Sequence, residues 1–160
     1  MYSPELQQQI QGLIDKNRLA NYLLSKYPSA HHMNNDKSLR EYAMILKNRF
    51  MKKSAPLSHV QYDHKIHVIN NALGLHSYAT RAHGGKLKTK NGIRISSLFK
   101  LAPEAFLNMI VVHELAHLKE KDHNKAFYQL CVHMQPDYHQ LEFDLRVYLT
   151  QLELKGDIYT

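Results

Sequence analysis

The sequence predicts an α+β fold in which a small β-sheet separates two groups of helices. Both ends of the 160-residue chain carry apolar residues at the three- and four-residue spacing of amphipathic helices. The stretch from residue 60 to residue 96 instead has short runs separated by Asn-Asn, Gly-Gly and Asn-Gly pairs, which is typical of a small antiparallel sheet. By length and lack of linkers, we expect one domain spanning residues 1–160.

Two helices are expected before the sheet. The first covers residues 4–26, because Pro4 suits a first helical turn and apolar residues recur on one face. Pro28 and the polar run after it end this helix. Asp36 is a suitable N-cap for a second helix, which is expected to end near Lys53.

The predicted strands are short and follow one another closely. They correspond to the runs 59–62, 66–69, 75–80 and 92–96. Because the sheet directly precedes the next helix, we expect an edge strand to lie beside that helix.

Three helices are expected after the sheet. Pro103 opens the first of them. Asp122 is expected to cap the second, which covers residues 123–134 and so places His123 in its first turn. The third covers residues 137–154 and is expected to end at Gly156.

The most informative motif is the run H-E-L-A-H from residue 113 to residue 117. On a helix, His113 and His117 leave the same face, so both imidazoles can bind one metal ion. Glu114 lies on the flank of that face. There it can act as a general base toward a water molecule on the ion without being a ligand itself.

His123 is the candidate third ligand. Ten residues of unbroken helix would put it about 15 Å from His113, so the helix must stop after His117. We therefore expect a turn near residues 120–122. Three protein ligands plus water is the catalytic zinc pattern. The remaining candidates for a fourth ligand are His133, His139 and Glu120.

A helix whose histidines only pack in the core or face solvent is the structural alternative. The apolar run 109–112 before the motif indicates a buried helix. Two histidines and a glutamate in such a helix would need polar partners. A bound metal ion meets this need, so the sequence favours a metal site.

Positive charge is concentrated around the predicted sheet. Residues 64–103 contain seven Lys or Arg and no Asp or Glu, so this basic segment accounts for the whole net charge of +7. Such a field favours an anionic partner, for example a nucleotide, nucleic acid or an acidic peptide. Lysines on a solvated strand edge are the alternative. The candidate substrate-binding residues in this segment are Arg81, Lys86 and Lys88.

The single cysteine and the absence of a secretory signal or a membrane-spanning apolar run indicate a cytoplasmic protein with no membrane partner. Cys131 lies in a helical pattern and is expected to be a small buried residue, not a nucleophile. The N-terminus lacks the basic and apolar regions of a secretory signal. No apolar run reaches the roughly 18 residues that a membrane span requires.

Six segments that span most of the chain match a known family. They are K-I-H-V from residue 65, N-A-L-G-L-H from 71, G-G-K-L-K from 84, the run 109–121, H-N-K-A-F-Y-Q-L-C from 123 and Y-H-Q-L-E-F-D from 138. These segments resemble the YgjP-like family of metal-dependent hydrolases, which is related to SprT-like zincin domains. The resemblance implies a zincin-like core with His113, His117 and His123 as zinc ligands and Glu114 as catalytic base.

Members of this family are described both as metallopeptidases and as UTP pyrophosphatases. One ion with three histidines and a glutamate base suits attack of water on a carbonyl. The carboxylate cluster with which nucleotide pyrophosphohydrolases usually hold Mg²⁺ is not visible. The basic segment, in contrast, suits a triphosphate. We therefore predict a zinc-dependent, peptidase-like hydrolase, with nucleoside triphosphate hydrolysis as the alternative and a nucleic-acid-associated module with structural zinc as a second alternative.

Three side chains beyond the motif are candidates for a supporting role. Tyr128, Tyr138 and His139 lie in the helices that follow it and can hydrogen-bond a developing oxyanion. Packing, or support of the metal ligands, is the alternative role for each of them.

Overall fold

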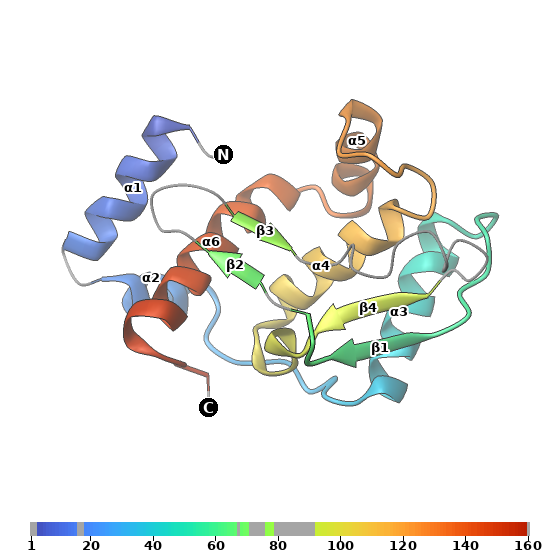
Figure 1. Ribbon diagram of the computed structural model, residues 1–160, viewed down its shortest axis with the longest axis horizontal. Helices are drawn as coiled ribbons and strands as arrows, with labels where there is room; N and C mark the ends of the chain where they lie inside the picture. Colours follow the sequence, from blue (N-terminus) through green and yellow to red (C-terminus); the bar gives the residue numbers. More distant parts are fainter. Residues whose placement is uncertain (1–2, 16–17, 67, 71–75, 79–91, 160) are drawn as a thin grey trace.

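The structure, a computed structural model, describes residues 3–15, 18–66, 68–70, 76–78 and 92–159. The helices are α1 (Pro4–Asp15), α2 (Leu19–Lys26), α3 (Asp36–Phe50), α4 (Glu104–Ala116), α5 (Lys125–Met134) and α6 (Tyr138–Lys155), with a 3-10 helix η2 (Ser97–Leu101) before α4. The strands are β1 (Val60–Asp63), β2 (Val68–Asn70), β3 (His76–Tyr78) and β4 (Ile93–Ser96). The predicted order of helices, strands and helices is confirmed (Figure 1).

The strands form two separate pairs. β1 pairs with β4 in parallel, from Val60 opposite Ile93 to Asp63 opposite Ser96, whereas β2 and β3 are antiparallel. The predicted antiparallel sheet is therefore confirmed for β2 and β3 and wrong for β1 and β4. The alternation of apolar residues along a strand defines its buried face but not the direction of its partner. A parallel pair needs a connection of about a dozen residues or more, and residues 64–92 provide it.

The N-terminal region forms two helices, where the sequence predicted one helix over residues 4–26. Continuing the apolar stripe of Ile10 and Ile14 would bring polar side chains to the buried face at positions 18 and 21. A second helix avoids this, because it presents a new face that buries Leu19 and Leu23. Both of these leucines belong to the hydrophobic core.

α3 begins one residue away from the predicted cap. The N-cap is Asn35, whose side-chain oxygen accepts a hydrogen bond from the backbone N–H of Ser38 at 2.8 Å. Asp36 instead accepts a hydrogen bond from the backbone N–H of Tyr62 at 2.8 Å. This bond ties the first turn of α3 to β1, a contact between distant residues that cap preferences do not predict.

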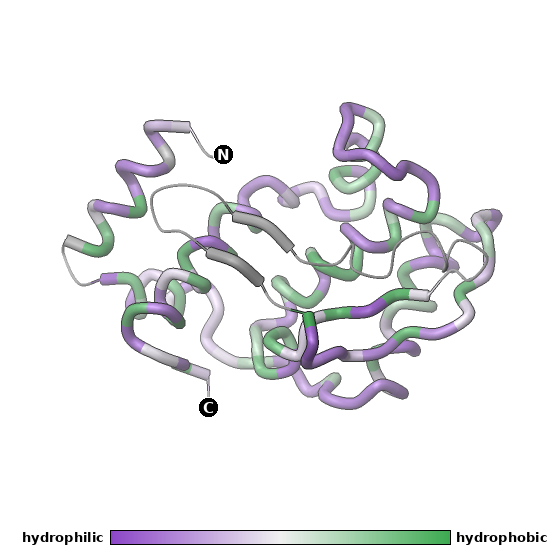
Figure 2. Tube along the Cα trace, viewed as in Figure 1, coloured by the Kyte–Doolittle hydropathy of each residue, from purple (hydrophilic) through white to green (hydrophobic). Residues whose placement is uncertain are grey.

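α4 is the buried centre of the fold. From Phe106 to Ala116 every residue except Asn108 is buried, and Figure 2 shows the hydrophobic residues gathered along this helix. A helix that is apolar on all sides must be covered on all sides. α3, α5, α6 and β4 all contact α4, so the helix that carries the motif is packed against elements from both halves of the chain.

A buried polar cluster fastens α2 to α6. Asp144 of α6 is fully buried. Its carboxylate accepts hydrogen bonds from the hydroxyl groups of Tyr22 (2.6 Å) and Tyr27 and from Nζ of Lys26 (2.8 Å). Burial, reinforced by the charge of Asp144, raises the pKa of both tyrosines, so they remain neutral donors. α2 and its C-cap residue thus help to position α6 beside α4.

The last helix matches its prediction closely. α6 ends at Lys155, and Gly156 follows with φ of 92°, a left-handed conformation that favours glycine. In Figure 1 helix α1 and the C-terminal end of α6 lie on the same side of the molecule. Among the described residues, no helix is both long enough and apolar enough to cross a membrane.

Candidate metal centre

The motif helix stops where the metal-site hypothesis requires. α4 ends at Ala116, and His117 is its C-cap. The backbone N–H groups of Leu118 and Glu120 donate to carbonyls of the last helical turn, at 3.0 and 2.9 Å. These bonds close a tight turn without a glycine. The helix ends as predicted, and the turn lies at residues 117–119, just before the expected 120–122. It lets the chain bring His123 back beside the helix.

The three histidines converge through their Nε2 atoms. Nε2 of His123 lies 3.0 Å from Nε2 of His117 and 3.4 Å from Nε2 of His113. All the ligand atoms of the group lie within 4.8 Å of one another. Two nitrogens that each lie about 2.0–2.1 Å from a tetrahedral ion are about 3.3 Å apart. The three imidazoles therefore fit a single metal ion.

The other ring nitrogen of each helical histidine has its own hydrogen bond. Nδ1 of His117 lies 2.9 Å from the backbone carbonyl oxygen of Glu120. Because a carbonyl only accepts, Nδ1 of His117 carries the proton and Nε2 presents its lone pair. Nδ1 of His113 lies 2.9 Å from the hydroxyl oxygen of Tyr138.

α5 begins later than predicted. Its N-cap is Asn124, whose side-chain oxygen accepts a hydrogen bond from the backbone N–H of Phe127 at 2.9 Å. Asp122 was the predicted cap, and His123 was expected in the first helical turn. Asn124 has the extended backbone that an N-cap requires. His123 therefore lies before the helix, where its ring can face α4.

Phe127 is a component of the centre that the sequence motif does not predict. Its ring is fully buried and contacts all three histidines, with ring centroids 5.0 Å from His113, 4.5 Å from His117 and 5.0 Å from His123. An apolar ring in this position limits the orientations that the imidazoles can adopt. The sequence does contain one signal for this position. Asn124 is a good N-cap, and a helix that begins after it places Phe127 in its first turn, close to His123.

Glu114 lies beside the three histidines. Its Oε2 atom is 4.0 Å from Nε2 of His113, and the residue is 9% exposed. The carboxylate is therefore close to the point where the Nε2 atoms meet, without belonging to the group of three. This is the arrangement expected of a general base that does not coordinate the ion.

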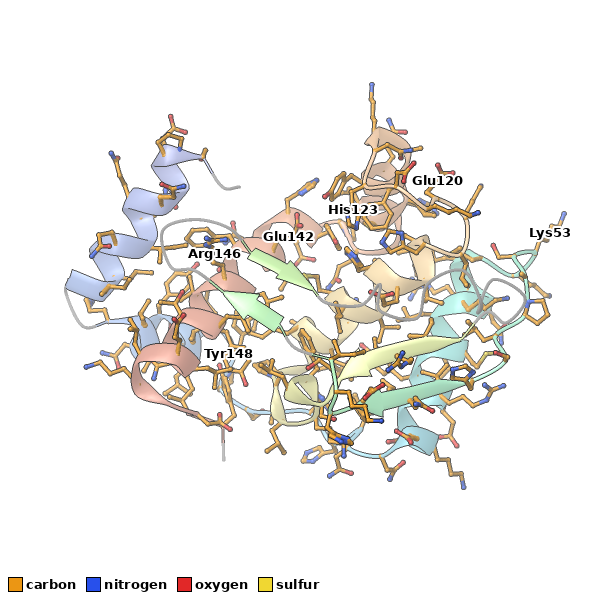
Figure 3. The ribbon with its side chains drawn as sticks, viewed as in Figure 1. Lys53, Glu120, His123, Glu142, Arg146 and Tyr148 are labelled. Carbon is orange, nitrogen blue, oxygen red and sulfur yellow. The ribbon has the colours of Figure 1, made fainter. Side chains whose placement is uncertain are left out.

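Side chains from α5 and α6 extend the site on one side. The ring of Tyr128 lies 6.4 Å from that of His123 and 5.6 Å from that of His139. Nδ1 of His139 is 2.9 Å from Oε1 of Glu142, and burial raises the pKa of this carboxyl group, an effect that His139 opposes. Figure 3 labels Glu142 on α6.

The remaining candidates are placed as follows. Among the described residues, the group that fits an ion consists of the three histidines alone. His133 packs edge-on against Phe50, and Glu120 contributes its backbone carbonyl to His117. A fourth protein ligand is thus not found in the part of the chain that the structure describes. The basic candidates Arg81, Lys86 and Lys88 lie outside the described residues.

Fold and site together point to one class of protein, the metal-dependent hydrolases that carry H-E-x-x-H on a buried helix. A model of the family described as YgjP-like, metallopeptidase domain matches residues 12–148. The chain belongs to the YgjP-like family. This confirms the resemblance seen in the sequence and the expectation of an enzyme.

The chain is also similar to a protein named UTP pyrophosphatase from Escherichia coli (strain K12). The two sequences are 56% identical over 153 residues, which cover 96% of this chain and 92% of the relative. No solved structure matches the chain. The similarity therefore extends over nearly the whole length of both proteins.

Proposed function

We propose that this protein is a zinc-dependent hydrolase that cleaves a nucleoside triphosphate, with UTP as the first candidate, to the monophosphate and pyrophosphate. The convergence of the three Nε2 atoms beside Glu114 is the observation that carries the metal-dependent chemistry. The substrate class rests on the relative named UTP pyrophosphatase. The excess of basic residues in 64–103 supports an anionic substrate.

Zinc is proposed because of the donor set. The three candidate ligands are imidazoles, which suit zinc, whereas magnesium prefers oxygen ligands. Three protein ligands leave one position for water or substrate, as in catalytic sites. When bound, the ion would act as a Lewis acid and lower the pKa of water toward neutrality.

The proposed roles of the residues follow from their positions. His113, His117 and His123 hold the ion, and Glu114 accepts a proton from the attacking water. The water oxygen then forms a bond to the α-phosphorus. The bond from that phosphorus to the bridging oxygen breaks, and pyrophosphate leaves with the electron pair. Glu114 is nearly buried, so it exchanges its proton with solvent after the products depart.

Peptide hydrolysis is the second candidate, because the family model is described as a metallopeptidase domain. The same residues would direct water to an amide carbonyl in place of phosphorus. Site chemistry alone favours the peptidase. The relative at 56% identity, named UTP pyrophosphatase, favours the nucleotide as substrate. A nucleic-acid-associated module with a closed structural zinc site is less well supported, since the described residues bring only three ligands together.

Replacing Glu114 tests this proposal. We expect purified wild-type protein to release pyrophosphate from UTP, and Glu114→Gln to lower the rate by about 10²–10⁴-fold, the usual contribution of a general base. The zinc content should not change, because Glu114 is not proposed as a ligand. Glu104→Gln, which changes an exposed glutamate of the same helix, serves as the matched control and should keep full activity.

Each other outcome has a defined meaning. Loss of zinc from Glu114→Gln would make Glu114 a ligand and the mechanism wrong. Hydrolysis of an unfolded polypeptide but not of UTP, again dependent on Glu114, would establish the peptidase. If neither substrate is cleaved and the protein binds DNA or RNA in a salt-sensitive way, the nucleic-acid module is favoured.

A further inference from the structure

Tyr138, the first residue of α6, lies directly behind the candidate metal centre. The residue is fully buried, and its hydroxyl oxygen is 2.9 Å from Nδ1 of His113. These two residues are 25 positions apart in the sequence, so the contact exists only because α6 packs against α4. The contact uses Nδ1 of His113, and Nε2 of the same ring faces the other two histidines.

The position of the Tyr138 ring is defined by its surroundings. Its centroid lies 6.3 Å from that of Tyr128 and 5.6 Å from that of His139, the latter in an edge-on arrangement. Its backbone N–H donates to the carbonyl of Gln135 at 3.0 Å, in the turn that leads into α6. The hydroxyl group is therefore placed by the fold itself, and this placement does not require a metal ion.

The direction of the hydrogen bond follows from chemistry. A neutral imidazole carries one proton, and a metal ligand must present the lone pair of the coordinating nitrogen. If Nε2 of His113 coordinates, Nδ1 carries the proton and donates it to the oxygen of Tyr138. The hydroxyl proton of Tyr138 then points away from Nδ1 of His113. Tyr138 also interacts with the thiol of Cys131, which lowers the pKa of that thiol against the larger, opposing effect of burial. Burial raises the pKa of this thiol to about 12, so Cys131 remains a neutral, buried group, as expected from the sequence.

We infer that Tyr138 is a positioning residue of the metal centre, whose hydroxyl holds His113 in the Nδ1–H tautomer with Nε2 turned toward His117 and His123. The inference rests on the proposed metal site. Partners of this kind normally fix the ring orientation and tautomer of a metal-binding histidine.

The chemical nature of the partner has a further consequence. The acceptors of His113 and His117 are a phenol oxygen and a peptide carbonyl, both of them neutral. A carboxylate acceptor would make a histidine a more basic ligand and reduce the positive charge felt at the ion. Neutral acceptors leave that charge larger, which favours polarisation of the substrate and of water.

The test compares Tyr138→Phe with Tyr148→Phe. Tyr148 is also a buried tyrosine of α6, but it packs against Phe106 and Tyr159 about 15 Å farther along the helix (Figure 3). Each protein is freed of metal and titrated with Zn²⁺ in competition with a chromophoric chelator. We expect Tyr138→Phe to raise the Kd for zinc about 10–100-fold and Tyr148→Phe to leave it within twofold of the wild-type value, about the resolution of such a titration.

A second measurement needs no variant. Nitrogen-15 NMR of the metal-free wild-type protein reports which ring nitrogen of His113 is protonated, and the Nδ1–H tautomer is expected. The opposite tautomer would overturn the inference, even if Tyr138→Phe fails to fold. A Kd for Tyr138→Phe equal to that of the wild type would also overturn it, as would an equal loss in Tyr148→Phe. Wild-type protein that binds no zinc would overturn the proposed metal site as well.

Discussion

At the scale of single residues, the centre depends on hydrogen bonds that a sequence motif does not record. The H-E-x-x-H pattern specifies which imidazoles share a helix face. It does not specify which nitrogen of each ring is protonated. For His117 the backbone carbonyl of Glu120 decides this. Every residue has a backbone carbonyl, so this hydrogen bond depends on the backbone conformation at position 120 and not on the side chain there.

Removing one imidazole should release the ion. We expect wild-type protein to carry about one Zn²⁺ per chain, and His117→Ala to retain only a small fraction of it, because two ligands hold zinc far less tightly than three. The control is His133→Ala, which changes a histidine that packs against Phe50 outside the group of three. Metal analysis after gel filtration measures both variants. Equal zinc content in wild type and His117→Ala would exclude the proposed site.

At the scale of elements, a buried histidine joins the segment between α2 and α3 to η2. His31 is only 7% exposed. Its Nε2 donates to the carbonyl of Phe99 at 2.6 Å, while its Nδ1 accepts from the backbone N–H of Met33 at 2.9 Å. This arrangement requires the neutral ring. Burial accordingly lowers the pKa of His31, against the opposing effect of the bond to Phe99.

The lowered pKa predicts how stability changes with pH. The unfolded chain takes up a proton at His31 near pH 6.5, whereas the folded protein does so only at lower pH. As pH falls through about 6.5 the unfolded state therefore binds more protons, and the free energy of unfolding decreases. His31→Gln, which keeps a donor and an acceptor but does not titrate, should show a smaller decrease. Urea unfolding between about pH 8 and about pH 5.5 measures the difference, and identical pH profiles would contradict the assignment.

At the scale of the whole molecule, the uneven charge distribution bears on the substrate. The basic segment 64–103 accounts for the net charge of +7. Exposed charges act over about 10 Å at 0.1 M salt, so their effect on an anionic substrate depends on where they lie. The candidates Lys86 and Lys88 lie outside the described residues, and only a functional measurement locates their influence.

Reversing these two charges tests the role of the segment. Lys86→Glu with Lys88→Glu should raise the KM for UTP severalfold at low salt and less at high salt, because salt screens exposed charges. Lys52→Glu with Lys53→Glu makes the same change in net charge on exposed residues elsewhere, and Figure 3 shows where Lys53 lies. If both double variants raise the KM equally, the change is due to net charge alone. If neither variant changes the KM, Lys86 and Lys88 do not bind substrate, and the alternative of lysines on a solvated strand edge is favoured.

Much of the fold was predictable because its signals are local. The spacing of apolar residues predicted the helices, and Gly156 predicted the end of α6. The four strands were located to within a few residues. The candidate ligands were also predictable, because helical spacing and one tight turn are properties of a short segment. Two N-caps were predicted at the wrong residue: Asp36 in place of Asn35, and Asp122 in place of Asn124. Asn and Asp cap helices about equally well, so the sequence does not distinguish them when they lie one or two residues apart.

The tertiary structure alone decided the features that depend on residues far apart in the chain. The parallel pairing of β1 with β4 is one, and the docking of α2 on α6 through Asp144 is another. The contact of Tyr138 with His113 is a third. The sequence by itself determined which side chains can bind a metal ion, because that follows from the geometry of one helix and the turn after it. Which partners orient those side chains depends on how separate elements pack, and no local pattern encodes that packing.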